Sequence, residues 1–257
     1  MQFPRLLLPR IAVWRTPTDL NIGGPSSPLV LSRVPPELPE IIESLDGSHS
    51  LADLNHEFDP QWVSWLLAVL DSHGYLGDGP SLTDPFNVRV HGESVLAHRL
   101  SALLAASSRT TSVRHYEYSF DPTALHLVAA GTAEVDRVLV TELQKQHCAH
   151  LIVRADETTA TVGPFVIPGM TSCLTCEDLA RRDQDPTWPV QAFQLGQVET
   201  HPGPWLCSWA GSTAVAHALV YARGLVPESA STTVEISAWD GRVTYRGWPV
   251  HPECPWH

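Results

Sequence analysis

The chain has few basic residues for its length of 257. Lys and Arg together number 16 against 28 Asp and Glu, which gives a formal net charge of -12 at pH 7. Binding to phosphates draws on clustered Lys and Arg, and the sequence has no run of basic residues. This composition argues against a general nucleic-acid binder and against attachment to an anionic membrane by charge.

Long apolar runs are also missing. No segment has the eighteen or so consecutive apolar residues that a bilayer-spanning helix needs. The opening stretch "MQFPRLLLPRIAVW" is interrupted by Pro4, Pro9 and Arg10, and no small-residue cleavage site follows a long apolar region. We therefore expect no signal peptide, no membrane span and a cytoplasmic protein.

Cysteine is sparse and odd in number, with five residues in a chain that lacks export features. An odd set argues against a disulfide framework and favours free thiols or a metal site in a reducing compartment. Cys148 and Cys207 stand among apolar residues of predicted helices, so we expect them to be buried and inert.

Residues 1–77 have the content of a small α+β domain. Short apolar runs at 10–14 and 28–32 predict strands, and "PPELPEIIESLDG" predicts a helix that ends at Gly47. Ser50 and Asp53 resemble a helix-starting capping pair. The clearest helix covers 59–73, before Gly74, with an apolar stripe made by Trp62, Leu66, Val69 and Leu70. This order suggests a winged-helix-like domain, followed by a Gly, Pro and Asp-rich linker at 78–85.

Residues 86–257 alternate short apolar strands with helices, which predicts an α/β sheet with parallel crossovers. We expect strands at 86–90, 112–118, 124–131, 150–155 and 159–166. The helix after Gly92 is expected to bury Val95, Leu96, Leu100, Leu103 and Leu104. Further helices are expected at 133–148 and 205–224, and a hairpin around Asp240 and Gly241 at 232–248.

Two pairs of metal-ligand residues stand far apart in this second part. Cys173-x-x-Cys176 and Cys254-x-x-His257 can supply four tetrahedral ligands from two turns, and thiolate with imidazole suits Zn²⁺. Four protein ligands leave no open position, so such a zinc would be structural. His251 is an alternative fourth ligand. The competing interpretation is a metal-free or redox-active dithiol at Cys173 and Cys176.

The turn after the first strand of this part is a second candidate site. A dinucleotide fold has G-x-G-x-x-G here, so that backbone amides approach phosphate at a helix N-terminus. This chain has Gly92-x-Ser94-x-x-Ala97. Ala97 still permits close packing of helix and strand, but Ser94 replaces the glycine that lets the backbone lie against phosphate.

These features carry a resemblance to a known family. The stretch "VGPFVIPGMTSCLTCEDLARRDQDPTWP" (162–189) and the closing "HPECPWH" resemble the ThiF-type fold of ubiquitin-activating-like adenylyltransferases over residues 86–257. The most similar members are divergent ones from the biosynthesis of ribosomally made, modified peptides. Relatives usually end in a second CxxC, where this chain has His257. Residues 1–77 resemble the PqqD-like peptide-recognition domain that often precedes such a domain.

The resemblance implies a fold class and a set of catalytic groups. The expected fold is α/β, with a Rossmann-like ThiF-type sheet and C-terminal zinc knuckles behind a small winged-helix-like α+β domain. Active members use ATP and Mg²⁺ to adenylate a carboxylate. Glu117 or Asp121 could be the remnant of their acidic ribose contact, while Gly131 and Thr132 stand where the Mg²⁺-binding Asp would be. Asp136 is the nearest acid, in the next helix. We therefore expect neither ATP nor Mg²⁺ as a cofactor.

The non-catalytic relatives imply a function. They hold the leader of a precursor peptide and present it to a modifying enzyme such as a YcaO-type cyclodehydratase. By this resemblance an extended leader would pair with an edge strand that includes Val30 and Leu31, with Trp62 or Trp65 lining the groove. Both Trp residues could equally pack the small core. A homodimer is a further implication. The alternatives are a diverged ATP-dependent adenylyltransferase and a redox or metal-handling protein that uses the CxxC.

Overall fold

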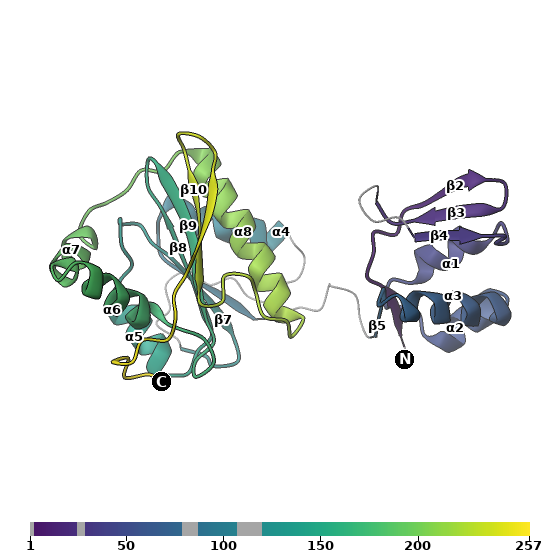
Figure 1. Cartoon of the computed structure of the whole chain (residues 1–257), viewed down its shortest axis with the longest axis horizontal. Coiled ribbons are helices and arrows are strands. Elements are labelled where there is room, and N and C mark those ends of the chain that lie inside the picture. The colour runs from purple at the N-terminus through teal and green to yellow at the C-terminus, as the bar shows by residue number, and fades with distance from the viewer. Residues whose placement is uncertain (1–2, 25–28, 79–86, 107–119) are drawn as a thin grey trace. The chain divides into compact units, whose positions relative to one another are not determined.

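A computed structural model of the chain describes residues 3–24, 29–78, 87–106 and 120–257. The chain divides into two compact units, Met1–Asp84 and Pro85–His257 (Figure 1). Most of the expected linker at 78–85, the expected strand at 112–118 and Glu117 lie outside the described residues. No helix in the described part of the chain is long and apolar enough to cross a membrane.

The first unit packs three helices against a three-stranded antiparallel sheet. The sheet has the order β2 (Ala12–Thr16), β3 (Asp19–Ile22) and β4 (Leu29–Ser32). The helices are α1 (Leu38–Ser44), α2 (Leu51–Glu57) and α3 (Pro60–Ser72). A separate antiparallel pair joins β1 (Pro4–Leu6) to β5 (Leu76–Asp78). The sequence pattern did not predict β3, which forms because alternate residues Leu20 and Ile22 are fully buried in the core.

Local signals place the helices of this unit well. Ser50 accepts a hydrogen bond from the backbone N–H of Asp53 at 3.1 Å, and the Asp53 carboxylate accepts from the N–H of Ser50 at 2.9 Å. This is the predicted capping box. Helix α3 buries Leu66 and Leu70, as its stripe predicts. Gly47 does not end α1 directly, because the helix stops at Ser44 and Gly47 turns the chain three residues later with φ +85°.

The second unit is built on a six-stranded sheet in the order β11-β10-β9-β8-β7-β6. Strands β6 (Val88–His91), β7 (Leu125–Ala129) and β8 (His150–Ala155) are parallel, as predicted. Strands β9 (Thr159–Val166), β10 (Thr232–Ser237) and β11 (Val243–Gly247) continue the sheet antiparallel. Strand β9 is not reached by a crossover. A turn closed by the Asp156 carboxylate joins it to β8, and three residues are too few for a crossover.

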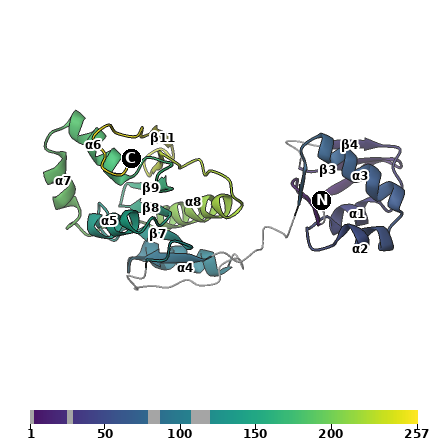
Figure 2. The same cartoon turned by 90° about the horizontal axis from the view of Figure 1, so that it is seen from below.

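Helices cover both faces of this sheet (Figures 1 and 2). One face carries α4 (Val95–Ala106) and α8 (Pro204–Ala222), and the other carries α5 (Arg137–Lys145), α6 (Leu174–Gln184) and α7 (Trp188–Leu195). Val95 does not join the buried face of α4 as expected: it is 67% exposed, because it stands at the first helical position, beyond the sheet. Ala97 is buried instead.

Candidate functional site

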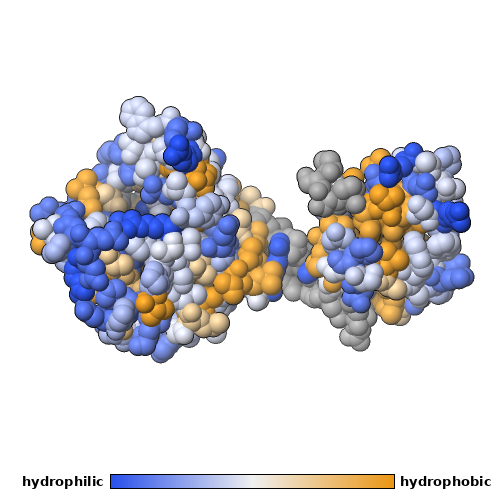
Figure 3. All heavy atoms as spheres, viewed as in Figure 1, coloured by the Kyte–Doolittle hydropathy of each residue, from blue (hydrophilic) through white to orange (hydrophobic). Residues whose placement is uncertain are grey.

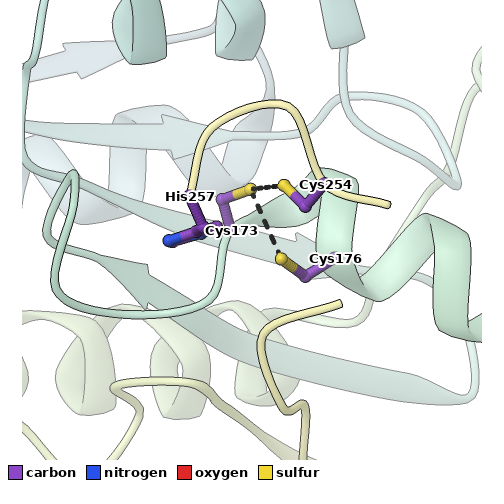
Figure 4. A group of neighbouring side chains, drawn as sticks. All are labelled: Cys173, Cys176, Cys254 and His257. Carbon is purple, nitrogen blue, oxygen red and sulfur yellow. Dashed lines mark hydrogen bonds between the residues drawn. The ribbon is translucent and has the colours of Figure 1, made fainter. Parts of the chain in front are cut away.

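The two predicted ligand pairs lie together in the second unit. Cys173 is the residue immediately before α6, Cys176 lies in the first turn of that helix, and Cys254 and His257 come from the last turn of the described chain. The four potential ligand atoms all lie within 4.8 Å of one another (Figure 4). The Cys173 sulfur is 3.9 Å from that of Cys176 and 3.6 Å from that of Cys254. This Cys₃His cluster could bind a metal ion.

The electrostatics of the cluster favour a cation. All three cysteines are buried, and burial raises the pKa of the Cys254 thiol to about 12, with the neighbouring sulfurs of Cys176 and Cys173 adding to the effect. Burial also raises the pKa of Cys173. Three thiols so close together cannot all ionise unless a positive charge lies between them. A divalent ion that prefers sulfur and nitrogen ligands would supply that charge.

His251 supports the cluster without belonging to it. Its backbone N–H lies 3.4 Å from the Cys176 sulfur, in hydrogen-bond geometry. Its ring Nε2 lies 2.9 Å from the Asp183 carboxylate, so the imidazole already has a partner. The alternative fourth ligand is therefore engaged elsewhere, while His257 lies with the thiols.

The glycine turn has a structural explanation that needs no nucleotide. Gly92 has φ +126°, and a Cβ there would lie 2.3 Å from the carbonyl oxygen of Ala129. The turn therefore passes against the end of the neighbouring strand β7. The Ser94 hydroxyl accepts from the Ala97 N–H at 3.2 Å, so it serves the start of α4.

The acids considered as remnants of an ATP site have other partners. Asp121 pairs with Arg89 at 3.0 Å and stands before β7, at the amino end of that strand. Asp136 is exposed and caps α5 by accepting from the Val138 N–H at 2.8 Å. After β7, the Gly131 carbonyl and the Ala133 N–H bond to the backbone of residues 198–200. Residues 198–200 thus pair with the segment that follows β7. Neither Asp121 nor Asp136 places its carboxylate at this strand end.

The proposed peptide-contact residues differ in exposure. Strand β4 is an edge of its sheet within the described residues, and Val30 on it is 42% exposed. Leu31 is buried in the core, so it can offer a partner only its backbone. Trp62 and Trp65 are partly buried, meet edge to face at 5.4 Å and pack against the same core. Apolar side chains gather on the visible face of this unit (Figure 3). The exposed large apolar residues of the unit include Phe3, Leu7, Ile11 and Val13.

Sequence reasoning missed a buried ionic network under α6. Arg154 is buried at the end of β8 and donates to Glu134 at 2.8 Å and to Glu177 at 3.2 Å. Burial alone would lower the pKa of Arg154, but these two carboxylates outweigh it and raise the pKa. Arg181 also pairs with Glu177, and Arg137 joins Glu134 to Asp178. No local pattern marks such a network, because its members come from β8, α5, α6 and the loop before α5.

These observations define a class of protein: a two-unit α/β chain whose larger unit has a six-stranded mixed sheet and a Cys₃His cluster that could hold a metal. No family profile matches the chain, and no curated protein does either.

The fold nevertheless has solved counterparts. A heterocyclase in complex with substrate and cofactor matches all of this chain with a TM-score of 0.71 and 16% identity, over 39% of its own length. The heterocyclase TruD matches with 0.65 and 16%, over 43% of its length. MccB of E. coli, solved with ATP, matches with 0.59 and 11%, over 99% of its length. The chain thus spans about two-fifths of the heterocyclases, and at these identities the likeness concerns the fold.

Proposed function

We propose that this chain is a non-catalytic, ThiF-like scaffold that binds a precursor peptide by its leader and presents it to a modifying enzyme such as a YcaO-type cyclodehydratase. In this proposal residues 1–77 form a PqqD-like winged-helix domain, 78–85 a linker, and 86–257 a Rossmann-like ThiF-type domain. The similarity of the whole chain to parts of two heterocyclases supports this assignment.

The observation that carries the proposal is the edge of β4. Edge strands present unpaired backbone groups, and an extended peptide can add to them as a further strand. Val30 is exposed on this strand, while Leu31 holds the strand firmly on its core. A leader would therefore pair with a rigid edge and set its alternate side chains beside Val30.

The strand ends support the proposal that this chain does not adenylate a substrate. Adenylation needs groups that neutralise the triphosphate and hold Mg²⁺. In this chain Gly131 and Thr132 follow the end of β7. Asp121 forms an ion pair with Arg89, and Asp136 caps α5. We therefore propose that binding, and not chemistry, is the task of the larger unit. Robust ATP–pyrophosphate exchange with any peptide would contradict this.

The Cys₃His cluster fits a structural Zn²⁺ in this scheme. Its three buried thiols and one imidazole are the donor set that zinc prefers, and four protein ligands leave no position for substrate. Cys173, Cys176, Cys254 and His257 would hold the ion and so attach the residues around 254–257 to α6.

Leader binding can be tested with matched edge variants. A fluorescein-labelled leader, taken from a short precursor gene near the gene for this chain, is titrated with the full-length protein. We expect Val30→Glu to weaken binding about tenfold or more, because it puts a charge where the added strand would pack. Val13→Glu, on the opposite edge strand β2 and 55% exposed, is the control and should bind like the wild type. Equal affinities for both variants would refute the assignment to β4.

A further inference from the structure

The hairpin strand β11 is an unprotected edge of the large sheet. The Ser237 N–H donates to the Arg242 carbonyl at 3.0 Å, and the Trp248 N–H donates to the Ser231 carbonyl at 2.7 Å. Bonded pairs alternate along an antiparallel ladder, so Thr244 and Arg246 also turn their backbone groups toward β10. The backbone groups of Val243, Tyr245 and Gly247 therefore face outward, and within the described residues no strand pairs with them. All of β11 is exposed.

A cavity of about 460 Å³ adjoins this edge on the face of the sheet that carries α6 and α7. Its floor includes Thr161, Glu235, Thr244 and Arg246, and Arg181 with Trp188 forms a wall. The other face of β11 carries apolar side chains, with Val243 39% and Tyr245 56% exposed. An added strand would thus meet a polar cavity on one face and an apolar surface on the other.

Two charges in the cavity lack an ionic partner among the described residues. Arg246 donates to the Gln184 side chain at 3.0 Å and lies 4.2 Å from the ring centroid of Trp248, which fixes its guanidinium without neutralising it. The Glu235 carboxylate accepts from the Thr161 hydroxyl at 3.4 Å. The remaining lining charges are matched: Arg154 and Arg181 by the buried carboxylates, and Asp156 by hydrogen bonds within its own turn.

We propose that the β11 edge and this cavity bind an extended peptide segment in which one acidic and one basic residue flank a single apolar residue. Alternate side chains of a strand point to the same face, so the acid and the base both enter the cavity while the apolar residue packs on Tyr245. The acid lies beside Arg246. Glu235 is two strand spacings, about 10 Å, from the added strand, a distance that Lys or Arg can span together with the Glu side chain. This site goes beyond the leader site on β4 and stands whether or not β4 binds a peptide.

The test uses full-length protein and fluorescein-labelled octapeptides with a central Glu-Val-Lys or Lys-Val-Glu, followed by fluorescence anisotropy. We expect at least one order of the two charges to bind, and Glu-Val-Glu and Lys-Val-Lys to bind about tenfold more weakly or worse. Arg246→Glu should cause a similar loss. Arg242→Glu is the matched control on the same hairpin: its side chain is 74% exposed and does not line the cavity, so this variant should bind normally.

Backbone pairing is tested separately. Tyr245→Pro removes an outward N–H without removing a bond to β10, and it should abolish binding, as should N-methylation of alternate peptide residues. The Val30→Glu variant should bind these octapeptides like the wild type, which separates this site from the leader site. Three results would overturn the proposal: no binding by any octapeptide at about 1 mM, binding that Arg246→Glu and Tyr245→Pro both leave intact, or a protein dimer that Tyr245→Pro dissociates, which would assign the edge to a second copy of the chain.

Discussion

At the scale of single residues, the cluster at the end of the chain makes the sharpest prediction. His257→Ala should lower zinc affinity, whereas His251→Ala should keep one zinc per chain, because the His251 ring is engaged with Asp183. Cys254→Ser should lose the metal, and a loss of about 3 kcal/mol would lower Tm by about 6–12 °C. Metal analysis of protein purified under reducing conditions, with thermal unfolding, measures both effects.

The control for this set is Cys148→Ala. Cys148 is a buried free thiol, as the sequence predicts, and burial raises its pKa. It lies outside the cluster, so its replacement should leave the zinc content unchanged. A zinc-free wild type would contradict the metal assignment altogether.

Three buried histidines predict a dependence of stability on pH. His91, His126 and His150 lie on adjacent strands β6, β7 and β8, and His91 Nε2 is 2.7 Å from His126 Nδ1. Burial lowers the pKa of His91 and of His150 to about 4, and it lowers the pKa of His126. The unfolded chain takes up these protons near pH 6.5, but the folded chain resists them until about pH 4. The contribution of these histidines to the free energy of unfolding is therefore fully present above pH 6.5, and it is lost as the pH drops from there toward 4.

The size of this effect can be measured by urea unfolding between pH 7.5 and 5. Lowering one pKa from 6.5 to about 4 corresponds to about 3.4 kcal/mol once the pH lies below both values, and to about 2 kcal/mol at pH 5. His91 and His150 together should therefore lower the free energy of unfolding by about 4 kcal/mol at pH 5. His91→Asn should reduce the slope of stability against pH. An unfolding free energy that stays constant over this range would show that the histidines are not buried as a neutral group.

At the scale of elements, the turn between β6 and α4 depends on one glycine. Gly92→Ala combines φ +126° with a Cβ 2.3 Å from a backbone oxygen, so we expect a loss of about 3 kcal/mol or more. Gly74→Ala, after α3, has φ +69° and open space, and should cost only about 1 kcal/mol. Urea unfolding measures both variants, and equal losses would mean that the contact with β7 does not constrain the turn.

Sequence patterns predicted helices and turns accurately where contacts between residues close in sequence determine the structure. The capping box at Ser50, the stripe on α3 and the hairpin around Asp240 and Gly241 all appear as predicted. Sequence patterns did not predict elements whose structure depends on contacts with residues far away in the chain. Strand β3 and the antiparallel pairing of β9 are not predicted, because strand pairing depends on which strand lies beside it. Helix α7 is not predicted either.

At the scale of the whole molecule, the two units have separate cores. All four candidate metal ligands belong to the second unit. We therefore expect a chelator to increase hydrogen exchange first in α6 and in the residues around 254–257. Helices α1, α2 and α3 should keep their protection at that stage. Exchange measured by mass spectrometry on peptides of the full chain tests this, and simultaneous loss of protection in both units would contradict it.

The sequence by itself determined most of the helices, the hairpin and the ligand types of the Cys₃His cluster, because caps and periodicity act over short distances. Only the tertiary structure decided which side chains meet. It paired His251 with Asp183, buried Leu31, enclosed Arg154 between two carboxylates and left β11 at an open edge beside Arg246. These contacts join residues far apart in the chain. Caps and periodicity report only on near neighbours in sequence, so they cannot show which distant residues the path of the backbone brings together.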